Sequence, residues 1–311
     1  MTGKPGAGLW FRSFQPAPEA PVRLVCLPHA GGSASFYLPV ARALSPKVEV
    51  MAVQYPGRQD RRNEAPVADI GLIADRIAEE LRTVTDRPYA LFGHSMGAIV
   101  GFEVARRLEA EGNGPTRLFV SGRRSPLLDR GDEWQPATDD EVITEIRSLD
   151  GTHGALLDDA EMRDMILPAL RADYAAVRRY RYRPGAPLTC PVTAFTGDTD
   201  RKAPVEAVEA WADLTLGGFG LHVLPGGHFF LVDAQDEVLR TVLDRLAPAS
   251  AGGGGGGGGG PPAPPPPPPP PRRRPGHRAL SAGEGRPRAP ALTAAPRGRM
   301  RRGRAHGGCP R

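Results

Sequence analysis

The middle of the chain alternates between two kinds of hydrophobic pattern. Short apolar runs rich in β-branched residues have the length and composition of buried strands. Six such runs are present: Val22–Leu27, Val48–Val53, Tyr89–Phe92, Arg117–Ser121, Val192–Thr196 and Phe219–Leu224. Between them, apolar residues recur three and four positions apart, which is typical of amphipathic helices. The clearest examples are Ile70–Val84, Ala98–Leu108 and Val238–Leu246. This alternation predicts an α/β fold with a doubly wound, mostly parallel sheet and helices on both faces.

One segment departs from the alternation. Residues 126–187 contain no strand-like run, and their pattern is helical over Asp139–Leu149, Asp159–Leu167 and Ala169–Tyr180. A helical insertion between two strands predicts a lid over the carboxyl edge of the sheet. Open α/β sheets bind their ligands at that edge.

The composition changes abruptly near Ser250. Gly252–Gly260 is unbroken glycine, and Pro261–Pro271 is proline except at one position. Polyglycine buries nothing and polyproline is a solvated extended helix, so neither offsets the entropy lost on ordering. We therefore predict an N-terminal extension over 1–21, an α/β domain over 22–250 with its lid at about 126–187, and a disordered tail over 251–311.

The charge distribution follows this division. The chain has a formal net charge of +5, but the tail alone holds 12 Arg and one acidic residue, so residues 1–250 carry a net charge of −6. The high pI therefore does not indicate nucleic-acid binding by the folded part. The tail itself could bind RNA or an acidic partner, although a functionless extension is the favoured interpretation.

Composition also narrows the class of protein. No run of 18 apolar residues predicts a membrane span, and the N-terminus lacks the pattern of a signal peptide. The three cysteines, Cys26, Cys190 and Cys309, are scattered, which favours reduced thiols in the cytoplasm over disulfides or a zinc site. No metal-binding or nucleotide-binding motif is present, so we expect no cofactor.

The strongest chemical signal is Gly93-His94-Ser95-Met96-Gly97, which follows a predicted strand and precedes a predicted helix. In this context G-x-S-x-G forms a tight turn that presents the serine hydroxyl above the sheet. Glycines on either side of the serine remove the Cβ atoms that would collide in such a turn. Ser95 is therefore the candidate nucleophile, and a chance match in a glycine-rich chain is the alternative.

A serine nucleophile needs a base. His228 lies in Pro225–Phe230, a loop after the last predicted strand and before the last helix, where hydrolases of this fold place their histidine. Five other histidines fit less well because of their positions in the tail, the lid, a strand or the far side of the serine turn: His277, His306, His153, His222 and His94.

The histidine in turn needs a carboxylate that fixes its tautomer. On this fold the chain order is Ser, then acid, then His, and Thr196–Asp200 follows the strand at the expected place. Asp200 is favoured because it comes where the turn redirects the chain towards the histidine loop. Asp198 remains an alternative, although it is better placed to brace that turn.

The developing oxyanion needs two N–H donors. One is expected from Met96, directly after the nucleophile. The other is expected from the loop after the first strand, Leu27–Gly32, where small residues let the backbone approach, and Ala30 is the preferred donor. An ordinary glycine turn is the alternative at that loop.

Two basic clusters remain, the segment Pro56–Arg62 and the group formed by Arg178, Arg179, Arg181 and Arg183. Either could contact an acidic protein or a phosphate. The default interpretation of such charge clusters is a solvated face.

Residues 22–250 resemble the type II thioesterases that accompany polyketide synthases and non-ribosomal peptide synthetases. The resemblance is carried by LPHAGGSASFY (27–37), QYPGRQDRR (54–62), FGHSMGAIVGFEVARRL (92–108), SGRRSP (121–126), LPALRADYAAVRRYRY (167–182) and PGGHFFL (225–231). The chain differs from the family in its Gly/Pro/Arg-rich tail and in the lid turn Gly151–Gly154.

The resemblance implies an α/β-hydrolase with a helical lid, a triad of Ser95, Asp200 and His228, and oxyanion donors at Ala30 and Met96. It also implies a function: hydrolysis of acyl groups from the phosphopantetheine arm of acyl or peptidyl carrier proteins, which edits stalled or misprimed synthases. The implied enzyme is a cytoplasmic monomer with no nucleic-acid or membrane partner.

Other functions share these features. A general serine esterase or lipase has the same fold and triad. A chain-terminating cyclase cut from a megasynthase is less expected because Met1 lies close to the first predicted strand. A binding protein whose tail is the functional part would not need an intact triad.

Overall fold

The computed structural model describes residues 9–84, 86–128, 138–149 and 159–247. The predicted tail over 251–311 lies outside the described residues. So do the first eight residues and the lid turn that contains His153.

The described residues form a seven-stranded sheet in the order β1-β3-β2-β4-β5-β6-β7. Its strands are β1 (Phe11–Arg12), β2 (Arg23–Leu27), β3 (Glu49–Val53), β4 (Tyr89–His94), β5 (Arg117–Ser121), β6 (Val192–Gly197) and β7 (Phe219–Leu224). Every neighbouring pair is parallel except β1 with β3. All six predicted strands are confirmed, and so is the mostly parallel sheet.

The strand β1 lies in the segment expected as an N-terminal extension. Phe11 pairs with Val53 of β3, and the side chains of Trp10 and Phe11 are buried. Residues 9–21 therefore belong to the folded domain in part. A two-residue strand is too short to show a hydrophobic period, which is why the sequence pattern did not predict it.

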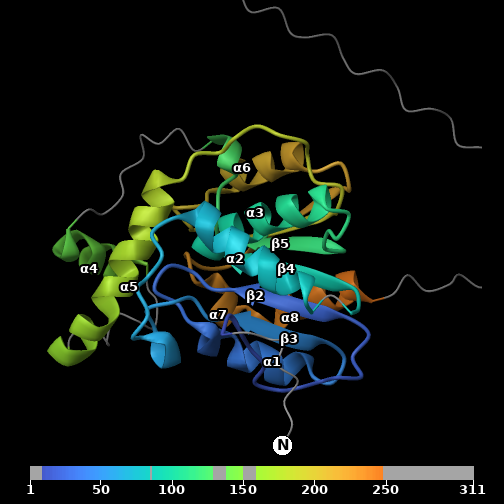
Figure 1. The fold of residues 1–311 in the computed structure, drawn as a ribbon. Coiled ribbons are helices and arrows are strands. Elements are labelled where there is room, and N and C mark those ends of the chain that lie inside the picture. The colour runs from blue at the N-terminus through green and yellow to red at the C-terminus, as the bar shows by residue number, and fades with distance from the viewer. Residues whose placement is uncertain (1–8, 85, 129–137, 150–158, 248–311) are drawn as a thin grey trace, which may run out of the picture. The chain divides into compact units, whose positions relative to one another are not determined.

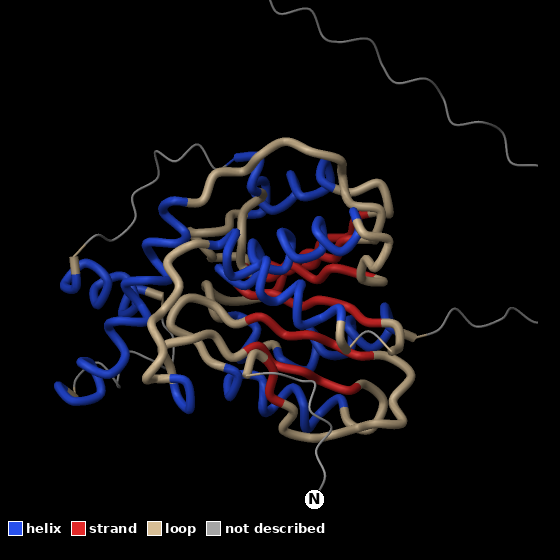
Figure 2. The backbone as a smooth tube through the Cα atoms, viewed as in Figure 1, coloured by secondary structure: helices blue, strands red, loops and turns tan. Residues whose placement is uncertain are grey.

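Helices cover both faces of the sheet (Figures 1 and 2). The main helices are α1 (Leu38–Leu44), α2 (Ile70–Arg82), α3 (Met96–Ala110), α4 (Asp139–Ser148), α5 (Ala160–Arg179), α6 (Val205–Glu209), α7 (Phe230–Asp233) and α8 (Gln235–Leu246). One core cluster joins α2 and α3 to one face, and a second joins α1 and α8 to the other. The two clusters confirm the doubly wound arrangement.

The helices α4 and α5 stand together to one side of the sheet, apart from the helices on its faces (Figure 1). The sequence predicted a break in α5 at Pro168, but the structure shows one continuous helix through this residue. Proline removes one helical hydrogen bond. Burial of Leu167 and Leu170 on either side of it holds the helix together.

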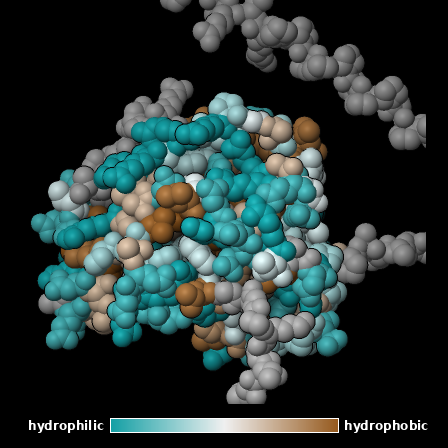
Figure 3. Space-filling model, in the orientation of Figure 1, coloured by the Kyte–Doolittle hydropathy of each residue, from teal (hydrophilic) through white to brown (hydrophobic). Residues whose placement is uncertain are grey.

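Side chains on the face seen in Figure 3 are largely hydrophilic, and apolar ones gather there only in small groups. Within the ranges that the structure describes, no helix combines the length and the apolar character needed to cross a membrane.

Candidate active site

Ser95 lies in the sharp turn between β4 and α3. Its backbone has φ 54° and ψ −115°, a strained conformation for a residue with a side chain. A Cβ atom at Gly93 would lie 2.1 Å from the carbonyl oxygen of Gly97, and one at Gly97 would lie 2.0 Å from that of Leu27. The turn therefore requires glycine at both positions, and it holds the Ser95 side chain at the carboxyl end of β4.

The structure brings Ser95, His228 and Asp200 together. The His228 Nε2 atom lies 3.0 Å from Ser95 Oγ, and its Nδ1 atom lies 2.9 Å from Asp200 Oδ2. Both His228 and Asp200 are buried. A hydroxyl, an imidazole and a carboxylate joined in this order can pass a proton from the nucleophile to the ring, with the carboxylate stabilising the imidazolium.

The two candidate aspartates make different contacts. Asp200 faces His228 with one oxygen, and its other oxygen accepts the backbone N–H of Lys202 at 2.9 Å. Asp198 instead accepts the backbone N–H of Gly226 at 2.9 Å. Asp200 is therefore the carboxylate next to the imidazole, and Asp198 ties its turn to the loop that carries His228.

The two expected N–H donors both border the site. Met96 is the first residue of α3, and the first N–H groups of a helix have no carbonyl partner inside it. Ala30 lines the same cavity as Ser95 and His228. Beyond Ala30, the N–H of Gly31 donates to a carboxylate oxygen of Asp173 at 2.7 Å.

A small cavity of about 40 Å³ opens beside Ser95 and His228. Its remaining wall is mainly apolar and comes largely from the lid: Ile146, Leu149, Ile166, Leu170, Tyr174 and Phe229. Sequence reasoning missed these residues as lining residues, because an apolar stripe on a lid helix does not show which side chains face the nucleophile. Such a cavity suits an apolar group of a substrate.

The first basic cluster corrects the expectation of a solvated face. Arg58 and Arg61 are buried, with relative exposures of 8% and 5%. Arg58 pairs with Asp173, and Arg61 pairs with Glu64 while lying over the ring of Trp10. The expectation was wrong here because a run of charged residues does not show which carboxylates and rings lie next to it in the folded chain. The cluster at Arg178, Arg179, Arg181 and Arg183 is exposed, as the default interpretation expects.

His94 packs as a buried ring behind the site. Its Nδ1 atom lies 3.0 Å from the Ser121 hydroxyl, and its ring centroid lies 5.1 Å from that of His228 and 5.8 Å from that of His29. Burial, and then the neighbouring histidines, lower the pKa of His94 well below its ordinary value. Because the His94 ring stays neutral, it places no second positive charge next to an imidazolium at His228.

We expect His94 to weaken the fold in acid. The unfolded chain takes up a proton at this residue near pH 6.5, whereas the folded protein resists protonation to lower pH. The free energy of unfolding should therefore fall below about pH 6.5, with up to ~1.4 kcal/mol per pH unit coming from His94.

Urea unfolding between about pH 7.5 and about pH 5 measures this slope in the wild type and in His94→Asn, whose amide can replace Nδ1 towards Ser121. The variant should show a flatter slope. Equal slopes would mean that His94 binds protons alike in both states.

A family model described as a thioesterase domain matches residues 22–246. The chain is 46% identical over 255 residues to "Thioesterase PikA5" of Streptomyces venezuelae. This alignment covers 79% of the present chain and 89% of PikA5. Among solved structures, the type II thioesterase BorB from the borrelidin biosynthetic cluster is 45% identical with a TM-score of 0.72, covering 78% of this chain and all of that one. The RedJ thioesterase from the prodiginine pathway of Streptomyces coelicolor is 41% identical with a TM-score of 0.68, covering 75% and 88%.

The mostly parallel sheet, the serine turn at its carboxyl edge and these structural neighbours define an α/β-hydrolase. Within that fold class, the chain belongs to the thioesterase family. It is a thioester hydrolase.

Proposed function

We propose that this enzyme hydrolyses acyl thioesters on the phosphopantetheine arm of acyl or peptidyl carrier proteins, and so clears stalled or misprimed units from polyketide or non-ribosomal peptide synthases. The observation that carries the proposal is the Ser95–His228–Asp200 network beside a lid-covered apolar cavity. The likeness to BorB and PikA5 supports the substrate class, because BorB is a type II thioesterase from the borrelidin biosynthetic cluster and PikA5 is a thioesterase.

In the first half of the proposed reaction, Ser95 Oγ attacks the thioester carbonyl carbon while His228 Nε2 takes the hydroxyl proton. The carbonyl oxygen becomes an oxyanion between the N–H groups of Ala30 and Met96. When the oxyanion collapses, the carbon–sulfur bond breaks and His228 returns the proton to the thiolate. The products are the free phosphopantetheine thiol and an acyl ester on Ser95.

Water completes the cycle. His228 takes a proton from a water molecule, whose oxygen attacks the ester carbonyl and regenerates the oxyanion. Collapse breaks the ester bond, and the Ser95 oxygen leaves with the proton from His228. Asp200 holds the imidazole in the tautomer that both halves need. The carboxylic acid is then free to leave.

A panel of acyl-loaded carrier proteins tests the function directly. Mass spectrometry of the carriers after incubation with wild-type enzyme should show loss of the acyl mass, and Ser95→Ala should leave it in place. The same acyl group presented as a free ester separates the proposal from a general esterase. A higher kcat/KM on the ester than on the carrier thioester would favour the esterase.

The partner proposal extends to the exposed arginines at the end of α5. Carrier proteins are typically acidic, and Arg178 and Arg179 lie on the outside of the lid helix. We expect the double charge reversal Arg178→Glu, Arg179→Glu to raise KM for an acyl-carrier substrate by about 10-fold at low salt, with little change in kcat.

Steady-state kinetics at two salt concentrations measures this effect, since screening should shrink the difference. Arg240→Glu on α8, also an exposed residue, is the matched control and should leave KM unchanged. An unaltered KM in the double variant would rule out the arginine contact.

The proposal also includes a monomeric enzyme that acts in the cytoplasm. Light scattering on the full-length chain, at the concentrations used for kinetics, checks the monomer.

A further inference from the structure

A buried ion pair joins the lid to the body of the enzyme. Arg58 follows β3 and Asp173 lies in α5, and both guanidinium Nη atoms lie 2.8 Å from the two carboxylate oxygens. Arg58 is 8% exposed and Asp173 is 1% exposed. Burying two charges is costly even when they pair in this bidentate way, so net stability is a weak explanation for the pair. Its other contacts indicate what it does.

Both side chains hydrogen-bond to the loop that carries the proposed oxyanion donor. Asp173 Oδ2 accepts the backbone N–H of Gly31 at 2.7 Å, and Arg58 Nη1 donates to the carbonyl oxygen of Gly32 at 2.8 Å. The ion pair therefore holds the backbone of two consecutive residues. Ala30 is bonded directly to the first of them.

The lid helix also packs against this loop through an apolar side chain. Leu170 lies one turn before Asp173 on the same face of α5, and a Cβ atom at Gly31 would lie 2.3 Å from Leu170 Cδ2. Gly31 has φ +75°, a conformation that favours glycine. The loop therefore fits closely against α5 only when residue 31 is glycine.

Gln54 is another buried polar residue that connects the oxyanion loop to the segment of Arg58. Gln54 accepts the N–H of Ala34 at 2.9 Å and donates to the carbonyl oxygen of Arg58 at 3.0 Å. The far end of the oxyanion loop is therefore tied to the same segment that carries Arg58.

We propose that Asp173 is a positioning residue for the thioesterase reaction: with Arg58, it fixes the Gly31–Gly32 backbone and so aims the Ala30 N–H at the oxyanion. The inference rests on the proposed role of Ala30. Donors in an oxyanion hole act by being fixed before the charge develops, and small displacements are costly. By this inference α5 is part of the catalytic framework, since moving the helix away would release the loop.

Asp173→Asn tests the inference. The amide keeps the size of the side chain but loses the charge that holds Arg58. We expect kcat on an acyl-loaded carrier to fall by about 100-fold, which is the range for a misplaced oxyanion donor, while KM changes by less than about 3-fold. Arg58→Lys keeps the buried charge but loses the bidentate geometry, and should lower kcat by about 10-fold.

Inactivation by a fluorophosphonate supplies a readout independent of the carrier. The reagent places its phosphoryl oxygen in the oxyanion hole, so its inactivation rate should fall with kcat. The end point of labelling counts folded active sites, which separates a slower site from a smaller amount of active enzyme. A structural role alone would lower the end point and leave the rate per site unchanged.

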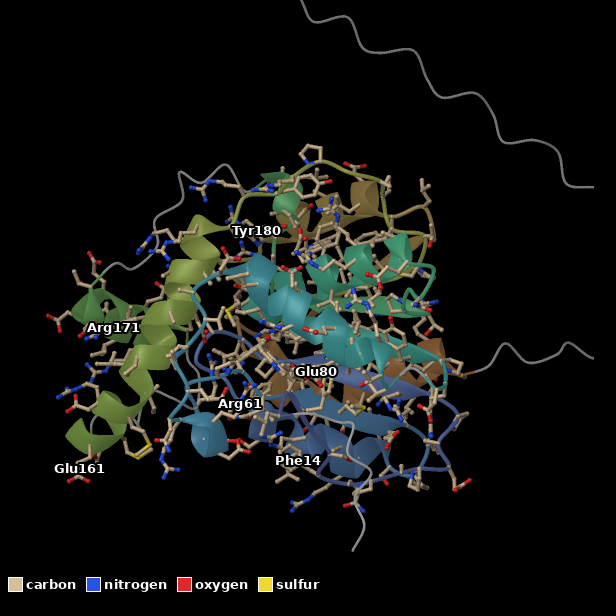
Figure 4. The ribbon with its side chains drawn as sticks, viewed as in Figure 1. Phe14, Arg61, Glu80, Glu161, Arg171 and Tyr180 are labelled. Carbon is tan, nitrogen blue, oxygen red and sulfur yellow. The ribbon has the colours of Figure 1, made fainter. Side chains whose placement is uncertain are left out.

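The ion pair between Arg171 and Asp139 is the matched control. It joins the lid helices α4 and α5 to each other, but it is exposed, and Figure 4 shows Arg171 on the part of α5 near α4. Asp139→Asn should keep kcat within about 2-fold, because exposed pairs contribute little.

The inference is overturned if folded Asp173→Asn keeps both kcat and the inactivation rate within about 3-fold of wild type. If that variant does not fold, Arg58→Lys decides in the same way, and wild-type rates overturn the inference. A wild-type enzyme inactive on carrier thioesters would instead contradict the proposed function, and the fluorophosphonate rates would still test Asp173.

Discussion

Replacing Ser95 with alanine should lower kcat on an acyl-loaded carrier by about 10⁶-fold and abolish fluorophosphonate labelling. Without the hydroxyl there is no acyl-enzyme, because Ser95 Oγ is the group that lies 3.0 Å from His228 Nε2. KM, or the binding constant for a non-hydrolysable carrier, should change little, since the hydroxyl contributes mainly to the chemical step.

Single-turnover kinetics followed by mass spectrometry measures this loss. Ser35→Ala, an exposed serine in the segment Ala34–Tyr37, is the control for the mutation itself and should retain the wild-type rate. A rate in Ser95→Ala within about 100-fold of the wild-type rate would contradict the assignment of Ser95 as the nucleophile.

Asp200→Asn should lower kcat by about 10⁴-fold, with the fold intact. The amide can donate to His228 Nδ1, which then carries no proton, so the Nε2 atom facing Ser95 holds one and cannot act as a base. The carboxylate that would stabilise the imidazolium is also lost. The effect is large because Asp200 Oδ2 is 2.9 Å from the ring and buried.

Asp198→Asn is the comparison that makes this result specific. Asp198 uses one oxygen to accept the Gly226 N–H, and an asparagine carbonyl can do the same. We expect kcat/KM to stay within about 5-fold of wild type. Equal losses in the two variants, or a larger loss in Asp198→Asn, would contradict the assignment of Asp200.

The pattern of apolar residues was enough to predict the six parallel strands and the main helices, because a buried strand or an amphipathic helix repeats its period over several residues. It failed where no such repeat exists. The pairing of Phe11 with Val53 is too short to leave a pattern. A proline normally marks a helix boundary, yet the packing of Leu167 and Leu170 carries α5 through Pro168.

The serine turn was predictable because its chemistry is local. Gly93 and Gly97 answer a steric requirement within five residues, and strand and helix signals flank them directly. The placement of His228 and Asp200 followed from the chain order of the fold. Their distances to one another follow only from the tertiary structure, which brings together loops after three different strands.

The sequence by itself determined the fold class, the order of the strands and helices, and the identity of the candidate nucleophile, because each depends on residues near one another in the chain. Only the tertiary structure decided that Arg58 is buried and that Asp173 holds the loop beside Ala30. A charged residue on a helix or in a basic run looks solvent-exposed in the sequence. Whether it is buried depends on a partner that here lies 115 positions away.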